Sequence, residues 1–435
     1  MFLRQLTIRN YKSLRNVTFA PTPLTAIVGP NAAGKTNFAD AIHFLSEVYG
    51  QGLETAIARK GGYENIAYRK KKRAQTPIEF EVVIDASGKE IVEHLLSLQH
   101  LLIYSPHIED YRLRLTHHFS FFAKGSGIRA PFAVKEDYLS FSASRSDGDE
   151  SFQEFAQIRR NSDGSITTIK NKKSKLANYL RGLGLEELEI ISSQFPSQYP
   201  DQSLIVTNNF PMPFAGYVAM HGANFRSYQL SAIYARQPGV LTPNPSLSPL
   251  GQNLPALVDW LQQHYPKLWA SVVDGMRDIL PGLNEIFTQD LHTQTLGLFF
   301  NEEGTGRPWN VNEVSDGTIQ ALALLVAAVD PRTSLLVIDE VESSSHPWIL
   351  RVIMKKMREV SKSKNVIVTS HSPVLVNLLK PEEVWVIFRR KSESQMKRLI
   401  DLDPSVKEGW ENGDFQLSDF LDSGTVGQAV PGGVW

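Results

Sequence analysis

The chain has 435 residues, of which 42% are hydrophobic and 21% are charged, a composition typical of a globular protein with two or three domains. It contains no cysteine, which excludes disulfides, thiolate metal sites and a cysteine nucleophile and favours a cytoplasmic location. The net charge of −1 indicates no overall field for nucleic acid. The start lacks the apolar core of a signal peptide, and the longest apolar run, Ala321–Val329, is too short to cross a bilayer, so we expect no membrane partner.

The N-terminal segment predicts strands, a Gly-rich loop and a helix. Apolar and polar residues alternate over residues 3–8, as in a half-exposed strand, and the apolar run of residues 24–28 predicts a buried strand. The sequence GPNAAGKT follows at residues 29–36. From Lys35 onward apolar residues recur at helical spacing, which predicts an amphipathic helix.

Residues 29–36 fit the phosphate-binding loop, in which successive backbone N–H groups surround the β-phosphate of a nucleotide. In this pattern Lys35 reaches the β- and γ-phosphates and Thr36 holds Mg²⁺. A buried strand before the loop and an amphipathic helix after it are the context that the pattern requires, and the helix adds its dipole. The sequence therefore predicts ATP and Mg²⁺ as cofactors.

The hydrophobic pattern changes in the middle of the chain. Residues 78–85 predict a strand, and between about 100 and 250 short alternating segments are broken by Gly, Pro and Ser, which predicts an inserted α+β arm. Residues 252–287 carry helical periodicity interrupted by prolines, so we expect two or three short helices there.

A helix that is apolar on every side follows at residues 314–330, VSDGTIQALALLVAAVD. Such a helix is buried, so its N-terminus is held firmly with unpaired N–H groups and a positive dipole end. Ser315 is a suitable cap, and Gly317 allows a close approach to the backbone. An anion is the natural ligand of this end, although a capped core helix without a ligand is the simpler alternative.

Two further buried strands end in polar residues. LLVI at residues 335–338 precedes Asp339 and Glu340, and NVIVTSHSP at residues 365–373 contains His371. Parallel strands buried on both faces have this pattern, and ligands bind at the edge where such strands end. We expect Asp339 to orient the water shell of Mg²⁺, Glu340 to polarise the attacking water, and His371 to contact the γ-phosphate. A polar strand end and a structural histidine are the alternatives.

These residues carry a family resemblance. GPNAAGKT, VSDGT, LLVIDE and TSHSP, in this order, resemble the Walker A, signature, Walker B and switch-histidine motifs of ATP-binding-cassette-type ATPases. The N-terminal strand and NYKSL at residues 10–14 resemble the RecF and SMC branch. More closely, the chain resembles stand-alone AAA-domain ATPases of prokaryotic defence loci, including the overcoming-lysogenization-defect (OLD) and PARIS types, over residues 1–85 and about 220–435.

The resemblance implies an α/β fold, a P-loop ABC-type ATPase head with an inserted α+β/helical arm. Four parts are expected, with Walker A in the first and the signature, Walker B and switch histidine in the last. They are an N-terminal lobe (1–85), the arm (86–250), a helical subdomain (251–300) and a C-terminal lobe (301–435).

The motifs and the resemblance together assign the site residues. Catalysis is assigned to Lys35, Glu340 and His371, and metal binding to Thr36 and Asp339. The nucleotide-binding residues are Gly29, Pro30, Asn31, Ala32, Ala33, Gly34, Lys35, Thr36, Asn37, Ser315 and Gly317. In such ATPases the signature serine faces the γ-phosphate held by a second subunit, so Ser315 is expected to act in trans.

Two departures from the family stand out. VESSSHP, residues 341–347, replaces the Pro-Glu-Asn-Gly run that often follows the acid pair, so the loop that communicates across the dimer is expected to be tuned differently. The glutamine that couples the Mg²⁺ site to the arm has no clear counterpart, and Gln75 is a candidate.

The resemblance implies an ATP hydrolase with composite sites in a head-to-tail homodimer or higher oligomer, which regulates a separate nuclease or toxin-like effector in anti-phage defence. A RecF-like DNA-repair ATPase and the ATPase subunit of an OLD-like nuclease are the alternatives, so nucleic acid stays open as a partner.

Several charged residues outside these motifs are candidates for phosphate or metal binding on weaker evidence. The basic runs at residues 68–73 and 170–175 could contact phosphates, although such loops are usually solvated. Arg59 is a weak candidate for an arginine finger. Asp401 and Asp403, two apart on an expected strand, would suit a nuclease metal site, but surface acids at a strand end are the better interpretation.

Overall fold

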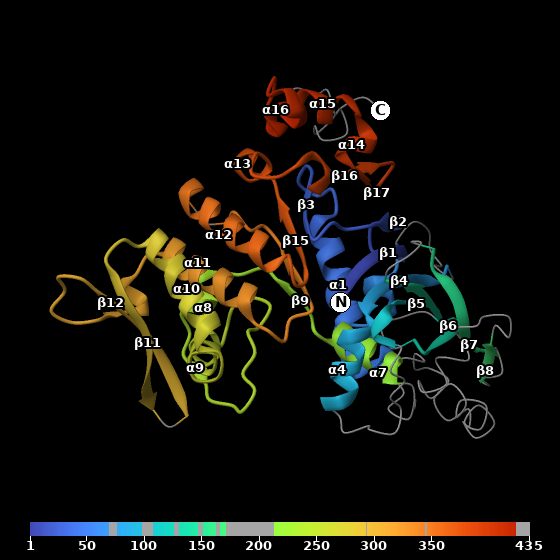
Figure 1. The fold of residues 1–435 in the computed structure, drawn as a ribbon, viewed down its shortest axis with the longest axis horizontal. Helices are drawn as coiled ribbons and strands as arrows, with labels where there is room; N and C mark the ends of the chain where they lie inside the picture. Colours follow the sequence, from blue (N-terminus) through green and yellow to red (C-terminus); the bar gives the residue numbers. More distant parts are fainter. Residues whose placement is uncertain are drawn as a thin grey trace. The chain divides into compact units, whose positions relative to one another are not determined.

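The computed structural model describes residues 1–68, 76–97, 108–125, 130–146, 151–161, 166–170, 213–292, 294–343 and 346–422 (Figure 1). They form two compact units. Unit 1 draws on residues 1–21, 40–225 and 389–396, and unit 2 on residues 22–39, 226–388 and 397–435, as far as these are described. The helix α1 (Lys35–Gln51) contributes its start to unit 2 and its remainder to unit 1. The four-part division expected from the sequence stays a prediction.

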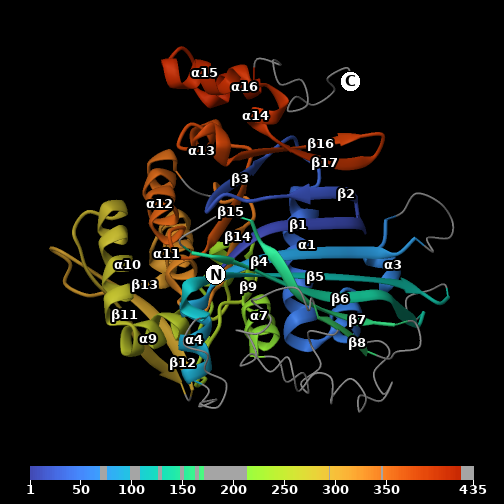
Figure 2. The same ribbon diagram turned by 45° about the vertical axis from the view of Figure 1, so that its right-hand side comes forward.

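Unit 1 is built on an antiparallel sheet whose strands follow the order β8-β7-β6-β5-β4-β1-β2 (Figure 2). The strands are β1 (Phe2–Tyr11), β2 (Leu14–Phe19), β4 (Ile78–Ser87), β5 (Tyr111–Ala123), β6 (Phe132–Arg145), β7 (Gln153–Arg160) and β8 (Ile166–Lys170). The strands expected over residues 3–8 and 78–85 are confirmed within β1 and β4. The helices are α2 (Leu53–Arg59), α3 (Tyr63–Ile66), α4 (Gly88–Ser97), η2 (Ile108–Asp110) and α7 (Pro213–Ala223).

The apolar face of this sheet holds the part of α1 that belongs to unit 1. Phe44 of α1 stacks on Phe80 of β4 and Phe121 of β5, with ring centroids 5.7 and 6.0 Å apart. Aromatic rings bury large areas, so this contact anchors the helix that follows the phosphate loop.

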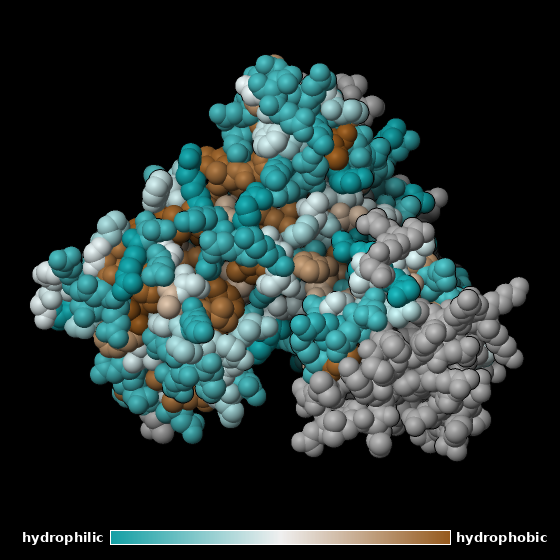
Figure 3. All heavy atoms as spheres, viewed as in Figure 1, coloured by the Kyte–Doolittle hydropathy of each residue, from teal (hydrophilic) through white to brown (hydrophobic). Residues whose placement is uncertain are grey.

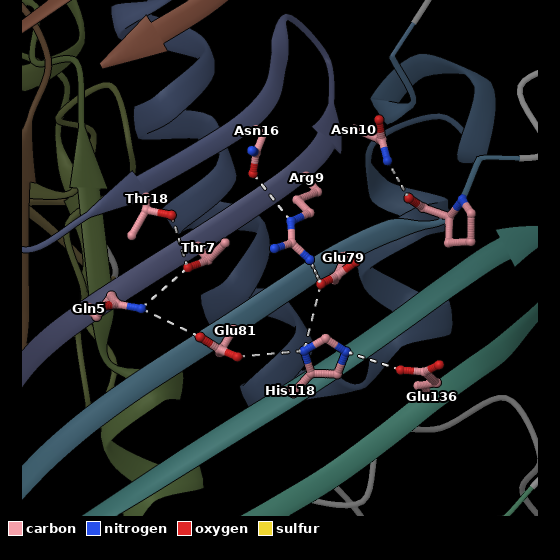
Figure 4. Close-up of polar contacts among 11 residues, drawn as sticks. Gln5, Thr7, Arg9, Asn10, Asn16, Thr18, Glu79, Glu81, His118 and Glu136 are labelled. Carbon is pink, nitrogen blue, oxygen red and sulfur yellow. Dashed lines mark hydrogen bonds and ion pairs between the residues drawn. The ribbon is translucent and has the colours of Figure 1, made fainter. Parts of the chain in front are cut away.

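The opposite face of the sheet is polar, as Figure 4 shows. Glu79 and Glu81 of β4 both lie 3.9 Å from Nδ1 of His118 on β5, and Glu136 of β6 lies 3.6 Å from its Nε2. Cross-strand pairs of this kind stabilise a sheet and explain why charged and apolar residues alternate along its strands.

The NYKSL turn between β1 and β2 is tied to α1 through Asp40. The Asp40 carboxylate accepts from the Tyr11 hydroxyl at 2.7 Å and lies 2.5 Å from Lys12 Nζ and 2.6 Å from Lys60 Nζ. Burial alone would raise the pKa of Asp40, but the hydrogen bonds from Lys12, Lys60 and Tyr11 hold it below its ordinary value. The turn therefore anchors α1 inside unit 1.

Unit 2 contains a sheet in the order β16-β3-β15-β14-β9, in which β16, β3, β15 and β14 pair in parallel. The strands are β3 (Leu24–Val28), β9 (Phe225–Tyr228), β14 (Leu335–Ile338), β15 (Asn365–Ser370) and β16 (Val384–Arg390). The strand β17 (Glu393–Arg398) follows, with residues 393–396 in unit 1. Every residue of β3, β14 and β15 is buried. The predicted strands at 24–28, 335–338 and 365–370 and the α/β fold class are confirmed.

Helices cover this sheet. Longer helices are α9 (Leu254–His264), α10 (Pro266–Ile279), α11 (Asp316–Val329) and α12 (Pro347–Val360), and Figure 1 shows α10, α11 and α12 side by side. Shorter ones are α8 (Ala232–Ala235), η5 (Val311–Glu313), α13 (Pro373–Val376), η6 (Pro381–Glu383), α14 (Leu399–Leu402), α15 (Ser405–Asn412) and α16 (Leu417–Asp422). A small second sheet joins β10 (Gly239–Val240), β11 (Leu283–His292), β12 (Thr295–Glu302) and β13 (Trp309–Asn310). No helix among the described residues is both long and apolar enough to cross a membrane.

The helix α11 is the buried helix that the sequence predicts. Every residue from Thr318 to Val329 is buried. The ammonium of Lys364 donates to the carbonyls of Ala328 and Asp330 at 3.3 and 2.7 Å, beside the C-terminus of the helix. Burial lowers the pKa of Lys364 to about 8, against the raising effect of Asp330. The C-terminal end of α11 is therefore held by hydrogen bonds from a side chain outside the helix.

Two expectations from the sequence are wrong. The helical pattern of residues 252–287 does give the short helices α9 and α10, but residues 283–287 begin β11, because Pro281 and Gly282, with φ of 93° at the glycine, end the helix. Asp401 does not lie on a strand but on the short helix α14, and Asp403 follows it and accepts from the backbone N–H of Ser405 at 3.0 Å. The Ile-Asp-Leu-Asp alternation therefore comes from a short helical segment and the turn that follows it.

Large apolar side chains reach the surface of unit 2. Among the described residues Ile233 and Trp348 are the most exposed of these, at 72% and 58%. Figure 3 shows apolar surface over the helical part of unit 2.

Packing of α1 against α7 gives a test of unit 1. A Cβ atom added at Gly222 would lie 2.2 Å from Cδ2 of Tyr49 on α1, whereas one added at Gly216 of the same helix meets nothing within 4 Å. We expect Gly222→Ala to lower the free energy of unfolding by about 1–3 kcal/mol through overpacking. The control Gly216→Ala should raise it by up to about 1 kcal/mol through helix propensity. Urea titration measures both, and equal effects of the two substitutions would contradict the packing.

Candidate nucleotide-binding site

Three parallel strands of unit 2 end at one edge of its sheet. Val28 of β3 pairs with Ser370 of β15, and Ile338 of β14 pairs with Val368 of β15. The residues that follow these strands are the phosphate loop, the Asp339–Glu340 pair and His371. The carboxyl edge of a parallel sheet thus gathers the three predicted motifs.

The phosphate loop is pressed against β16. A Cβ atom at Gly29 would lie 2.0 Å from the carbonyl oxygen of Ile387, so only glycine fits there. Ala32 and Gly34 have φ of 61° and 118°, and the backbone N–H of Ala33 donates to the Pro30 carbonyl at 3.2 Å. Loops with alternating left-handed residues turn successive N–H groups inward and bind anions.

Lys35 points back into its own loop. Its Nζ donates to the carbonyls of Gly29 and Pro30 at 2.7 and 3.2 Å, and the residue is buried. Burial lowers the pKa of Lys35, while the carboxylates of Asp339, Glu340 and Glu342 act to raise it. Lys35 is therefore held within the field of all three carboxylates.

The acid pair is organised by Thr369, which the sequence analysis missed. The Thr369 hydroxyl accepts from the backbone N–H of Glu340 at 2.9 Å and donates to Oδ1 of Asp339 at 2.5 Å. Glu340 has φ of 53°, a left-handed conformation that is strained for a residue with a Cβ atom. Thr369 thus fixes the backbone of Glu340 and one oxygen of Asp339.

His371 is held by Glu342, a second residue that the sequence analysis missed. The same carboxylate oxygen, Oε1 of Glu342, accepts from the backbone N–H of His371 at 2.7 Å and lies 2.8 Å from its Nδ1. The two residues come from the loop after β14 and the end of β15. Glu342 belongs to VESSSHP, of which residues 344 and 345 lie outside the described residues.

The signature turn is capped and clamped. The Ser315 hydroxyl accepts from the backbone N–H of Thr318 at 3.2 Å, which confirms it as the cap of α11, and its side chain lies at the exposed start of the helix. Arg236 donates to the carbonyls of Val311 and Val314 and lies 2.6 Å from Oδ1 of Asp316. Arg236, a third residue missed from the sequence, therefore holds the turn in place.

The remaining candidates do not join this group. Arg59 contacts Glu47 of α1 at 3.5 Å within unit 1, and Asp401 is paired with Arg398 at 3.0 Å. Gln75, the basic runs at 69–73 and 171–175, and the segment from 423 onward lie outside the described residues.

The residues at the sheet edge fit ATP and Mg²⁺. Phosphate oxygens are acceptors for Lys35 and for the loop N–H groups, and the dipole of α1 begins at the same place. The Thr36 hydroxyl and the Asp339 carboxylate are the hard oxygen ligands that Mg²⁺ takes together with phosphate. Asn31, Asn37 and the loop backbone complete the predicted nucleotide-binding set, with Ser315 and Gly317 at the signature turn.

The order and geometry of these motifs define a P-loop domain of the ATP-binding-cassette type. A family model described as "AAA domain, putative AbiEii toxin, Type IV TA system" matches residues 24–377, a range that contains the phosphate loop, the signature turn, the acid pair and His371. The chain belongs to this family.

The individual proteins that resemble this chain match it over a short stretch or at low sequence identity. The DNA replication and repair protein RecF of Lactobacillus acidophilus is 32% identical over 96 residues, which are 21% of this chain and a quarter (25%) of RecF. Among solved structures, an SMC head bound to the C-winged helix domain of ScpA is 11% identical with a TM-score of 0.48, covering 91% of this chain and 98% of that chain. The SMC head domain from Thermotoga maritima is 14% identical with a TM-score of 0.40, over 92% and 99%.

The left-handed backbone of Glu340 can be tested directly. Glu340→Gly and Glu340→Ala both remove the carboxylate and differ by one Cβ atom. Because φ is 53° there, we expect the glycine variant to be more stable by about 1 kcal/mol, opposite to the usual order of these residues. Chemical denaturation measures the difference, and an alanine variant of equal or higher stability would contradict this geometry.

Proposed function

We propose that this chain is an ATPase that binds and hydrolyses ATP with Mg²⁺ at composite sites of a head-to-tail homodimer. In this proposal it is the ATP-gated regulator of a separate effector protein in prokaryotic defence. The observation that carries the proposal is the convergence of the phosphate loop, the Asp339–Glu340 pair and His371 at the ends of β3, β14 and β15.

Each residue has a chemical task in this reaction. Lys35 donates to the β- and γ-phosphates, which offer charged acceptors in place of the two loop carbonyls. Thr36 and Asp339 would hold Mg²⁺, which would supply positive charge beside the phosphates. Glu340 orients and polarises the attacking water, and His371 donates to the γ-phosphate. The Thr369 bridge keeps the metal ligand and the general base in fixed relative positions.

The trans role of Ser315 is supported by the setting of α11. The helix is buried from Thr318 to Val329 but has an exposed, capped N-terminus, and Arg236 binds the turn that leads into it. Rigid donors are what sensing a single phosphate requires. The exposed Ile233 lies on α8, three residues before Arg236, so apolar surface accompanies the turn that a second subunit would cover.

A defence role with a separate effector is supported by the family match. The family description names a putative AbiEii toxin and a type IV TA system. Among the described residues Asp401 and Asp403 form no joint site, so the nuclease alternative gains no support from them. The effector in this proposal is a nuclease or toxin-like protein.

The partial likeness to RecF favours a second candidate, a DNA-binding repair ATPase. ATP hydrolysis measured with and without DNA ends separates the two functions. Stimulation by DNA in the absence of any protein partner would favour the repair role.

The division of tasks between Lys35 and Glu340 predicts two different defects. Glu340→Gln should bind ATP normally but lose turnover by about 10²–10⁴-fold, because the amide cannot accept a proton from water. Lys35→Ala should lose ATP binding. Binding is measured by equilibrium titration and turnover by phosphate release. An equal loss of affinity in both variants would contradict the assigned roles.

The trans assignment of Ser315 predicts that two inactive variants complement each other. Lys35→Ala disables the site on its own loop, and Ser315→Arg blocks the γ-phosphate position of the partner's site. In a mixed dimer both changes fall in one composite site and the other is intact. With half of the dimers mixed, we expect about a quarter of wild-type activity if the sites are independent.

This complementation is measured as phosphate release after subunit exchange, which differently tagged chains verify. Recovery of activity in a chain held monomeric would exclude the trans role. Verified mixed dimers that bind ATP without any recovery would also count against independent composite sites.

A further inference from the structure

Glu342 is a buried carboxylate with one partner residue among the contacts that the structure describes. Its side chain is 11% exposed, and Oε1 receives both the backbone N–H and the Nδ1 of His371. The other oxygen, Oε2, is buried without a hydrogen-bond partner among the described residues. Leaving a charged oxygen in this state costs free energy, so its retention calls for a reason beyond loop packing.

The geometry determines which nitrogen of His371 faces outward. A carboxylate can only accept, so Nδ1 must carry the proton in this hydrogen bond, and Nε2 is left as the outer nitrogen. The side chain of His371 is 58% exposed, whereas its anchor is buried. The backbone bond to the same oxygen fixes the base of the ring as well.

The carboxylate also lies in the field of the phosphate loop. Glu342 is one of the three carboxylates that act on Lys35, together with Asp339 and Glu340. It differs from them because its hydrogen bonds go to His371. One carboxylate thus connects the loop after β14, the end of β15 and the charge of the phosphate-binding lysine.

We propose that Glu342 is the positioning residue for His371, and that it aims Nε2 at the γ-phosphate during ATP hydrolysis. The role rests on the proposed ATPase function and deepens it. Glu342 itself touches neither the nucleotide nor the attacking water. Its contribution is the orientation of the ring, because the carboxylate that accepts from Nδ1–H leaves Nε2 facing outward. Nε2 donates to the γ-phosphate when the ring carries a proton on both nitrogens, as an imidazolium.

A double-mutant cycle tests this role. We expect Glu342→Ala to lower kcat by about 10- to 100-fold with the Kd for a non-hydrolysable ATP analogue unchanged. His371→Ala should lower kcat at least as much, and the double variant no further, because Glu342 acts through His371. Glu342→Gln keeps an oxygen acceptor and should retain more activity than Glu342→Ala.

Glu382→Ala is the matched control. Glu382 is a half-exposed carboxylate of the same unit, 3.1 Å from Lys407, and its loss should leave kcat unchanged. Additive effects in the cycle, or a Glu342→Ala variant with wild-type kcat, would overturn the positioning role alone. Wild-type protein that does not hydrolyse ATP would overturn the proposed function and this role with it.

Discussion

The site depends on the register of three parallel strands. Because Val368 pairs with Ile338, Thr369 comes beside Asp339, one residue further along both strands. Because Ser370 pairs with Val28, His371 and Gly29 leave the sheet side by side. The strands are buried throughout, so a slip of one residue would exchange the side chains that pack on the two faces of the sheet. The hydrophobic core thus sets the spacing of the polar groups at its edge.

Hydrogen bonds from side chains then hold the backbone at the sheet edge and at the ends of α11. Thr369 supports a left-handed Glu340, and strain of this kind costs about 1–3 kcal/mol unless its surroundings hold it. Lys364 binds carbonyls at one end of α11, while Ser315 caps the other. In each case a side chain from a neighbouring element satisfies backbone groups that the strand or helix leaves open.

Sequence patterns revealed those parts of the molecule that are local. Periodicity and turn chemistry identify the phosphate loop, the buried strands and the apolar α11, because a continuous stretch of sequence encodes each of them. The partners that the sequence did not reveal are distant in the chain. Thr369 and Glu342 bind residues 29 positions away, and Arg236 binds one 80 positions away. No local sequence pattern predicts such contacts. The alternation of residues 400–403 predicted a strand wrongly, because four alternating residues fit a strand as well as a turn of helix.

The clamp that Arg236 places on the signature turn bears on the kinetics of assembly. A turn that is already ordered in the single chain loses little conformational entropy when a second surface closes over it. In the proposed dimer, association would then require no slow rearrangement of that turn, and the encounter rate would be governed by diffusion and orientation. The lifetime of the closed state would instead follow the lifetime of the bound γ-phosphate. Arg236 lies outside every recognised motif, yet by ordering the turn in advance it would leave the bound nucleotide to set the lifetime of the dimer.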